Sequence, residues 1–163
     1  MKRAQAWIFE YIISFLIFLG ALFVAISVLS GSSDASNYVS LKGEANHISG
    51  LLLSEGLPKE WGYDNVQAIG VLSGDRVDAY KLEEFQKLSY SSMKSLLGVT
   101  NEFAFYFENV SGIIDINGKC YWGYDYSACD DVLDDINYSE LSFVRRITVF
   151  NSSLVEMVVL LWR

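Results

Sequence analysis

The sequence predicts an α+β protein in which a long N-terminal helix packs on an antiparallel β-sheet head that carries two short helices. A charge-free apolar run from Tyr11 to Leu29 predicts a membrane-spanning first half of the helix. Apolar residues at spacings of three and four between Leu41 and Leu52 predict an amphipathic outer half. Alternating apolar residues begin at Phe103 and predict strands.

The apolar run contains no proline, and at about 1.5 Å per residue it can cross a hydrocarbon core of roughly 30 Å. A secretory signal peptide has a shorter apolar core, so we expect this segment to stay with the protein. Lys2 and Arg3 precede the run, and the next basic residue is Lys42. Because basic flanks stay in the cytoplasm, the N-terminus is expected inside and the rest of the chain outside.

Glu10 places a carboxylate at the cytoplasmic edge of this span, where a charge is costly unless it is paired or lies near the headgroups. Either it lies in the headgroup zone without a role, or it has a partner. The stretch Arg3-Ala4-Gln5, followed by Glu10 and an unbroken apolar helix, resembles the class III signal peptide of archaeal type IV pilins. The resemblance implies that a prepilin peptidase removes the leader after Ala4 or after Gln5.

In filaments of that family the apolar helices leave the lipid and pack against each other. A new amino group at the cut end can then pair with Glu10 of a neighbouring subunit, which removes two unpaired charges from an apolar setting. The outer part of the chain also resembles archaeal pilin-like surface proteins without a catalytic role. The matching segments are Leu57-Pro58-Lys59-Glu60-Trp61, Val66 to Val71, Lys81, Leu88-Ser89-Tyr90, Leu96-Leu97-Gly98 and Val158 to Arg163.

These observations divide the chain into a basic leader (1–5), a transmembrane or assembly helix (6–30), an amphipathic continuation (31–56) and a head (57–163). One apolar face of the continuation is formed by Leu41, Ala45, Ile48 and Leu52. The stretch Gly31 to Asp34 predicts a soft point between the two helical halves. Gly56-Leu57-Pro58 is expected to end the helix.

The first half of the head alternates turn signals with short elements. Val66 to Leu72 predicts a strand between two turns. Asp78 predicts the cap of a helix whose apolar face holds Leu82, Phe85 and Leu88. A second short helix runs from Tyr90 until Gly98 stops it.

The second half of the head predicts about five antiparallel strands. Phe103, Phe105 and Phe107 point to one face of the first strand. Asn117-Gly118 predicts a tight hairpin turn between 113–116 and 119–124. A second hairpin is predicted around Asn151-Ser152-Ser153, with strands 143–150 and 154–162.

Cys120 and Cys129 are the two cysteines of the chain. An even number of cysteines on the outer side of a membrane favours a disulfide that closes a short loop. Two free thiols are the alternative. Three acceptor motifs for N-glycosylation begin at Asn109, Asn137 and Asn151, all on the side predicted to be external.

The remaining composition argues against an enzyme. His47 is the single histidine, so a Ser-His-Asp or Cys-His arrangement has only one possible base. The formal charge of −8 leaves no basic patch for nucleic acid. No cofactor or metal is expected, although an acidic cluster is either a calcium ligand set or a solvated loop. That cluster is Asp125, Asp130, Asp131, Asp134 and Asp135.

A group of aromatic residues has two interpretations, an adhesive surface or packing around the disulfide. It consists of Trp61, Tyr121, Trp122, Tyr124 and Tyr126. The sequence as a whole predicts a minor pilin or pseudopilin of an archaeal surface filament. Its expected partners are the membrane, other pilin-like subunits, the prepilin peptidase and the assembly machinery. The alternative is a single-span protein that binds a ligand outside the cell without polymerising.

Overall fold

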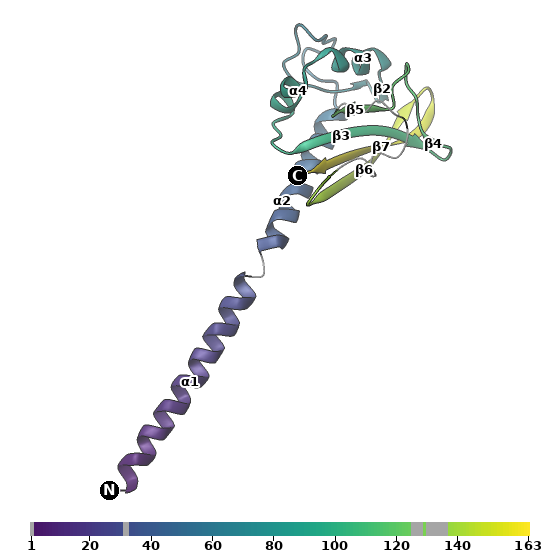
Figure 1. Ribbon diagram of the computed structural model, residues 1–163. Coiled ribbons are helices and arrows are strands. Elements are labelled where there is room, and N and C mark those ends of the chain that lie inside the picture. The colour runs from purple at the N-terminus through teal and green to yellow at the C-terminus, as the bar shows by residue number, and fades with distance from the viewer. Residues whose placement is uncertain (1, 31–32, 125–128, 130–136) are drawn as a thin grey trace. The chain divides into compact units, whose positions relative to one another are not determined.

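The computed structural model describes residues 2–30, 33–124, 129 and 137–163 (Figure 1). Side chains are described from residue 10 to 28 and from residue 39 onward, apart from the two gaps in 125–136. The chain forms two compact units, Met1–Asn37 and Tyr38–Arg163. We call them the N-terminal unit and the head unit and describe each by itself.

The N-terminal unit consists mainly of helix α1 (Lys2–Ser30). It contains the apolar run for which the sequence predicted a helix. Every described side chain of this helix is exposed. In the predicted soft point, residues 31–32 lie outside the described residues, and Ser33 and Asp34 are helical.

Helix α2 (Ser33–Leu52) carries the predicted apolar face into the head unit. Leu41, Ala45, Ile48 and Leu52 are each at most 1% exposed and belong to the main hydrophobic core. The side chain of Glu44, also on α2, accepts hydrogen bonds from the backbone N–H groups of Thr100 and Asn101. The face predicted by the spacing of apolar residues is therefore confirmed.

The predicted helix end at Gly56 is wrong, because α2 ends at Leu52. Carbonyl groups at its C-terminal end and just beyond it accept hydrogen bonds from a segment that follows later in the chain. Val71 N–H donates to Leu52 O at 2.8 Å, and Leu72 N–H donates to Ser54 O at 2.9 Å. These bonds satisfy acceptors that a helix end otherwise leaves unpaired.

The strand predicted from Val66 to Leu72 is wrong for most of its length, because of the same contact. Only Leu72 is in a strand, β1 (Leu72–Ser73). The residues before it run past the end of α2, where the N–H of Val71 binds the helix instead of a neighbouring strand. Lys81 is also buried here, and its Nζ donates to Glu55 O and Leu72 O.

Three residues lie in close contact beside this helix end. The indole Nε1 of the fully buried Trp61 donates to Gly70 O at 2.8 Å. A Cβ atom on Gly70 would lie 2.4 Å from Gly56 N and 2.4 Å from Ser54 O. Both of these atoms belong to the backbone, so neither can rotate away. Gly56 itself has a positive φ of 73° and lies against the Trp61 ring.

The two predicted short helices are confirmed. Strand β2 (Arg76–Val77) pairs with β1, and Asp78 then caps α3 (Ala79–Lys87) by accepting from Tyr80 N–H. Helix α4 (Tyr90–Leu97) ends at Gly98, whose φ of 67° is left-handed. Leu82 and Phe85 of α3 and Leu97 of α4 are each at most 1% exposed and lie in the main core.

The remaining strands are β3 (Glu102–Asn109), β4 (Gly112–Ile113), β5 (Tyr121–Gly123), β6 (Leu141–Phe150) and β7 (Ser153–Trp162). The described sheet has the order β1-β2-β6-β7-β3-β4, with β5 also paired to β3. The prediction of an antiparallel sheet needs correction, because β2 and β6 are parallel at Arg76 and Val149. The sheet is therefore mixed.

Only one of the two predicted hairpins is confirmed. Asn151 and Ser152 have φ values of 47° and 65°, and they join β6 and β7 in a tight turn that pairs Phe150 with Ser153. The turn at Asn117-Gly118 also has positive φ values, but its flanks share a single bridge. The segments on its two sides supply β4 and β5, and both pair with β3 instead of with each other.

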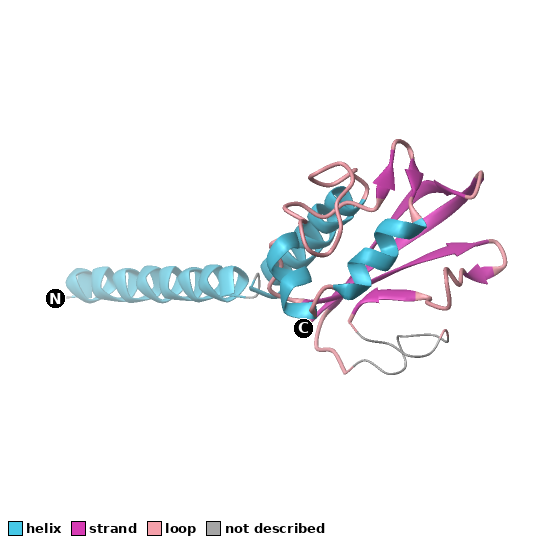
Figure 2. Cartoon of the chain, turned by 90° about the horizontal axis from the view of Figure 1, so that it is seen from above, coloured by secondary structure: helices cyan, strands magenta, loops and turns pink. Residues whose placement is uncertain are grey.

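Figure 2 shows the strands of the sheet in magenta. Residues are buried on both faces of this sheet. Its inner face holds Phe103, Phe105 and Phe107, which share the main core with residues of α2, α3 and α4. Its outer face carries a smaller cluster that includes Ala104, Tyr121 and Trp162. The predicted alternation along β3 is thus confirmed, although both of its faces are covered.

We predict that Gly70→Ala lowers the free energy of unfolding of the head by about 2–3 kcal/mol, because its Cβ would overlap two backbone atoms. The control is Gly50→Ala on the exposed side of α2, where no atom lies within 4 Å. That change should raise stability by up to about 1 kcal/mol through helix propensity. Thermal unfolding followed by near-UV circular dichroism measures both. Equal stability of the two variants would contradict the close approach.

Candidate functional site

The exposed apolar surface of α1 is the first candidate site. The 19 residues Glu10–Val28 have a mean hydropathy of 2.6, which makes this stretch long and apolar enough to cross a membrane. Tyr11, Ile17 and Phe23 are between 67% and 79% exposed. A continuous apolar surface of this extent is stable only against lipid or against another protein.

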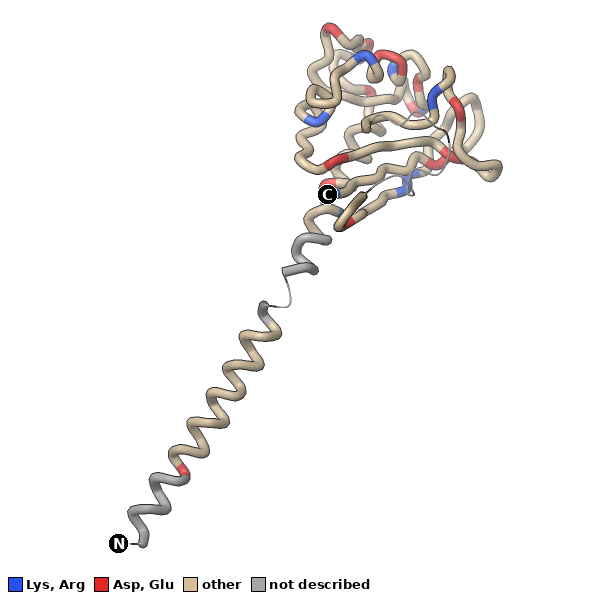
Figure 3. Tube along the Cα trace, viewed as in Figure 1, with Lys and Arg blue, Asp and Glu red and all other residues tan. Residues whose placement is uncertain are grey.

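Glu10 is the one charge among the described side chains of α1, and Figure 3 colours the described acidic residues of the chain red. Ala4 and Gln5, the predicted cleavage positions, have helical backbone in α1. After cleavage the new amino group belongs to Gln5 or to Ala6, which lies five or four residues before Glu10 and about 6–8 Å from it along the helix axis.

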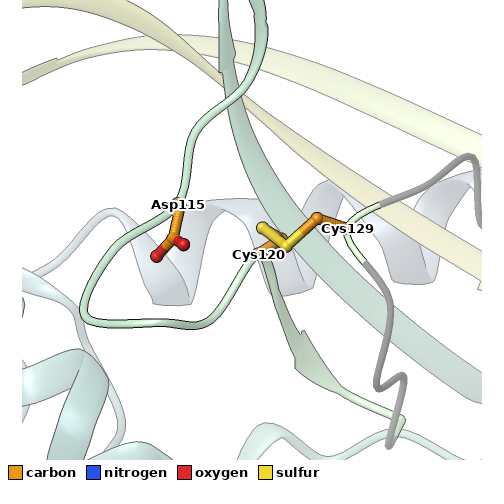
Figure 4. Close-up of side chains that lie close together, drawn as sticks. All are labelled: Asp115, Cys120 and Cys129. Atoms are coloured by element: carbon orange, nitrogen blue, oxygen red, sulfur yellow. A yellow bond between two sulfur atoms is a disulfide. The ribbon is translucent and has the colours of Figure 1, made fainter.

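The second site contains the two cysteines (Figure 4). Cys120 and Cys129 form a disulfide, with their Cα atoms 5.3 Å apart. The predicted bridge is therefore confirmed, and the alternative of two free thiols is wrong. The bridge ties Cys120, just before β5, to a residue nine positions later.

Asp115 lies beside this disulfide, and ligand atoms of the three residues fall within 4.8 Å of one another. Zinc-type sites bind thiolate sulfur, whereas both sulfur atoms here are already bonded to each other. The Asp115 carboxylate accepts a hydrogen bond from Gly118 N–H at 2.6 Å. Its role is to hold the Asn117-Gly118 turn, and the group offers a metal only one suitable ligand.

The three predicted glycosylation positions, Asn109, Asn137 and Asn151, are all exposed. Asn109 lies in the turn between β3 and β4, where its Oδ1 accepts from Ser111 N–H. Asn151 lies at the tip of the β6–β7 hairpin. These positions are accessible to a modifying enzyme, and glycosylation at each stays a prediction.

Of the two interpretations of the aromatic group, the adhesive surface is wrong for most of its described members, which are packed inside the head. Trp61, Tyr121 and Trp122 are at most 5% exposed. Trp122 stacks on Phe105 with ring centroids 5.7 Å apart. Tyr124 is 43% exposed, so one described residue of the group reaches the surface substantially.

Other sequence candidates are placed differently. Tyr126 lies outside the described residues, and so does the whole acidic cluster, Asp125, Asp130, Asp131, Asp134 and Asp135. His47 is exposed on α2.

Sequence reasoning missed two carboxylates that hold loops. Glu55 accepts from Gly74 N–H, and this bond lowers the pKa of the Glu55 carboxyl. Glu84 is buried and accepts from Lys87 Nζ and Tyr63 N–H, which together lower its pKa. Gly74 and Tyr63 lie far from these carboxylates in sequence, so no local spacing indicates those two contacts, whereas Lys87 lies three residues from Glu84 on α3.

Sequence reasoning also missed an apolar area on the outer face of the sheet. Phe143, Ile147 and Leu154 are between 59% and 73% exposed. Beside them Arg145 forms ion pairs with Glu108 and Glu156. The area lines part of a groove of about 410 Å³. The alternation of Phe143, Arg145 and Ile147 within one strand is a signal from which this face could have been found.

Comparisons with known proteins give no relative for this chain: no protein-family model, no curated protein and no solved structure matches it. The fold and its sites therefore stand on the contacts described above.

We predict that Cys120→Ser lowers the stability of the head by roughly 2–3 kcal/mol, because the closed loop is short. Peptide mapping without reductant should recover the two cysteines of the native chain in one linked fragment. As a control, Ser111→Ala in an exposed turn leaves the bridge intact. Two free thiols in freshly isolated native protein would contradict the bridge.

Proposed function

We propose that this protein is a pilin-like structural subunit, a minor pilin or pseudopilin, of an archaeal type IV pilus-type filament on the cell surface. The observation that carries the proposal is α1, a helix whose described side chains are all exposed and, after Glu10, uncharged and mostly apolar. A helix of this kind can lie in lipid before assembly and against the helices of other subunits afterwards.

The proposal gives each part of the chain a place. The leader (1–5) is removed on the cytoplasmic side, where Lys2 and Arg3 hold the N-terminus. The helix from residue 6 spans the membrane and later forms the filament core. The amphipathic helix continues it and packs on the sheet of an extracellular head. Membrane, assembly machinery and other subunits are the partners.

Glu10 has a defined role in this proposal. Its carboxylate is proposed to pair with the new amino group, on Gln5 or Ala6, of a neighbouring subunit when the helices pack. Each subunit would then supply one cation and one anion to its neighbours. Two charges that are costly separately are neutralised when the helices pack.

A second candidate function is a single-span surface protein that binds a partner through its head and does not polymerise. The groove beside Arg145, Ile147 and Leu154 favours it, because exposed apolar side chains around ion-paired charges are typical of interaction surfaces. Both candidates keep the head outside the cell. They differ in whether the leader is removed and whether Glu10 matters.

The first test concerns processing. Mass spectrometry of the protein from its native membrane should show loss of the first four or five residues, ending after Ala4 or Gln5. The matched control is the same chain from cells that lack the prepilin peptidase, where Met1 or Lys2 should remain. An intact leader in cells with an active peptidase would contradict the pilin proposal and leave the single-span protein.

The second test concerns Glu10. Glu10→Gln should leave membrane insertion intact or slightly easier, because it removes a charge near lipid. Its recovery in sheared surface filaments should fall at least about tenfold, because the neighbouring amino group is left unpaired in an apolar setting. Quantitative immunoblots of filaments and membranes measure both.

Glu60→Gln makes the same chemical change on the exposed surface of the head and is the control. It should assemble like the wild-type chain. Equal recovery of the Glu10 variant from filaments would overturn the pairing role. If neither the wild-type chain nor the variants enter any filament, the single-span function is supported instead.

A further inference from the structure

One edge of strand β6 has backbone groups without a partner among the described residues. In the tight β6–β7 hairpin, Phe150 and Ser153 form the hydrogen-bonded pair next to the turn. Alternate residues of β6 therefore bond to β7, and the others direct N–H and C=O to the opposite edge. These outward positions are Leu141, Phe143, Arg145, Ile147 and Val149.

Strand β2 covers that edge only at Val149, which pairs with Arg76. Figure 1 shows β6 along one margin of the sheet, with β7 on its other side. Among the described residues no strand pairs with this edge at positions 141 to 147, a length of about 20 Å at roughly 3.3 Å per residue. Open edges of this length favour pairing with another strand unless charges block them.

The two arginine side chains of β6 point away from its open edge. The Arg145 guanidinium reaches Glu156 on β7 and Glu108 on β3, so it lies across the outer face toward the middle of the sheet. Arg146 points to the inner face, where it donates to Ser49 and Asn46 of α2. Neither arginine extends beyond the edge to repel an incoming strand.

The charges near the edge also favour a second copy of this chain as the partner. Arg145 and Arg146 carry two positive charges, and Glu108 and Glu156 carry two negative ones, so the local sum is zero. The chain as a whole carries −8, and two copies repel each other over most of their surface. They can approach most closely where the local charge is balanced.

We propose that the heads of two copies join through β6, edge to edge and antiparallel, around a twofold axis. Outward positions must face outward positions, which leaves two central registers. One places Arg145 opposite Arg145 of the other copy, and like residues with equal charge are unfavourable there. The other places Leu141 opposite Ile147 and Phe143 opposite the aliphatic part of Arg145.

The structure favours the second register, because Leu141, Phe143 and Ile147 then form apolar cross-strand pairs on the outer face. Such a joint buries Phe143 and Ile147, which are 59% and 72% exposed in the single chain. It goes beyond the filament proposal, since it uses the head alone and applies equally to a protein that never polymerises.

The test is cysteine cross-linking of the full-length chain in membranes. The double variant Leu141→Cys/Ile147→Cys should give a covalent dimer on mild oxidation, at least about fivefold more than Phe143→Cys/Ile147→Cys, since only the first pair comes within disulfide reach. Both variants share Ile147→Cys and differ by one outward position. More dimer from the second variant would overturn the register.

A second pair of variants tests the edge itself in the Leu141→Cys/Ile147→Cys background. Phe143→Pro removes an outward N–H and no bond to β7, so it should reduce the dimer at least about fivefold while the head stays folded. Phe143→Ala keeps that N–H and should reduce it less. Retention of the Cys120–Cys129 bridge reports correct folding.

Three results would overturn the proposal: no dimer from either cysteine pair, a dimer unaffected by Phe143→Pro, or cross-linking to a different protein. Adding Glu10→Gln separates this joint from filament assembly. The dimer should persist with Glu10→Gln if β6 joins the heads, whatever becomes of the filaments. Loss of the dimer with that change would show that the helices, and not the heads, bring the copies together.

Discussion

The arrangement of the head depends on how α2 ends. Val71 N–H donates to Leu52 O, the last carbonyl of the helix, and Leu72 N–H donates to Ser54 O just beyond it. The Lys81 ammonium group donates to Leu72 O and Glu55 O. Burial lowers the pKa of the Lys81 ammonium, so its charge is kept at a cost that the two carbonyl bonds offset. This contact fixes where the chain leaves the helix and where β1 begins.

Several features follow from that fixed point. The backbone at Gly70 passes so close to the backbone of Ser54 and Gly56 that only glycine fits at position 70. The β1–β2 hairpin then meets β6 so that β2 runs parallel to β6, with Arg76 paired to Val149. Because this hairpin is short, it covers one end of β6 and leaves the rest of that edge open.

The elements that the sequence predicted correctly are those that local chemistry determines. Asp78 caps α3 and Gly98 stops α4 through bonds within a few residues. Asn151 and Ser152 adopt the positive φ values of the turn, and long alternating strands on both sides hold the register. The apolar face of α2 was visible because its four buried residues recur with helical spacing.

The failures involve competition between distant segments. Asn117-Gly118 forms its turn, but the neighbouring residues gain more by pairing with β3, where Trp122 stacks on Phe105. The segment from Val66 is apolar like a strand, yet the end of α2 takes Val71 N–H. A single sequence indicates the local structure that each segment can form. It does not show with which of several distant segments that segment will pair.

The two association surfaces that we propose, α1 and the β6 edge, would depend on different interactions. In the proposed filament the α1 surfaces gain nothing from the hydrophobic effect while they lie in lipid, so their assembly would depend on close packing and on pairing of Glu10 with an amino group. The β6 edge lies on a head that carries polar and charged residues, and its pairing would depend on backbone hydrogen bonds and on apolar side chains leaving water.

A contact that forms only between helices and a contact that forms only between heads can be made in either order. The net negative charge opposes both in dilute solution, because it keeps the heads apart until the membrane or a neighbouring helix raises their local concentration. On this argument neither surface needs to be strong alone, and the pair of them gives an association that is specific to subunits held side by side.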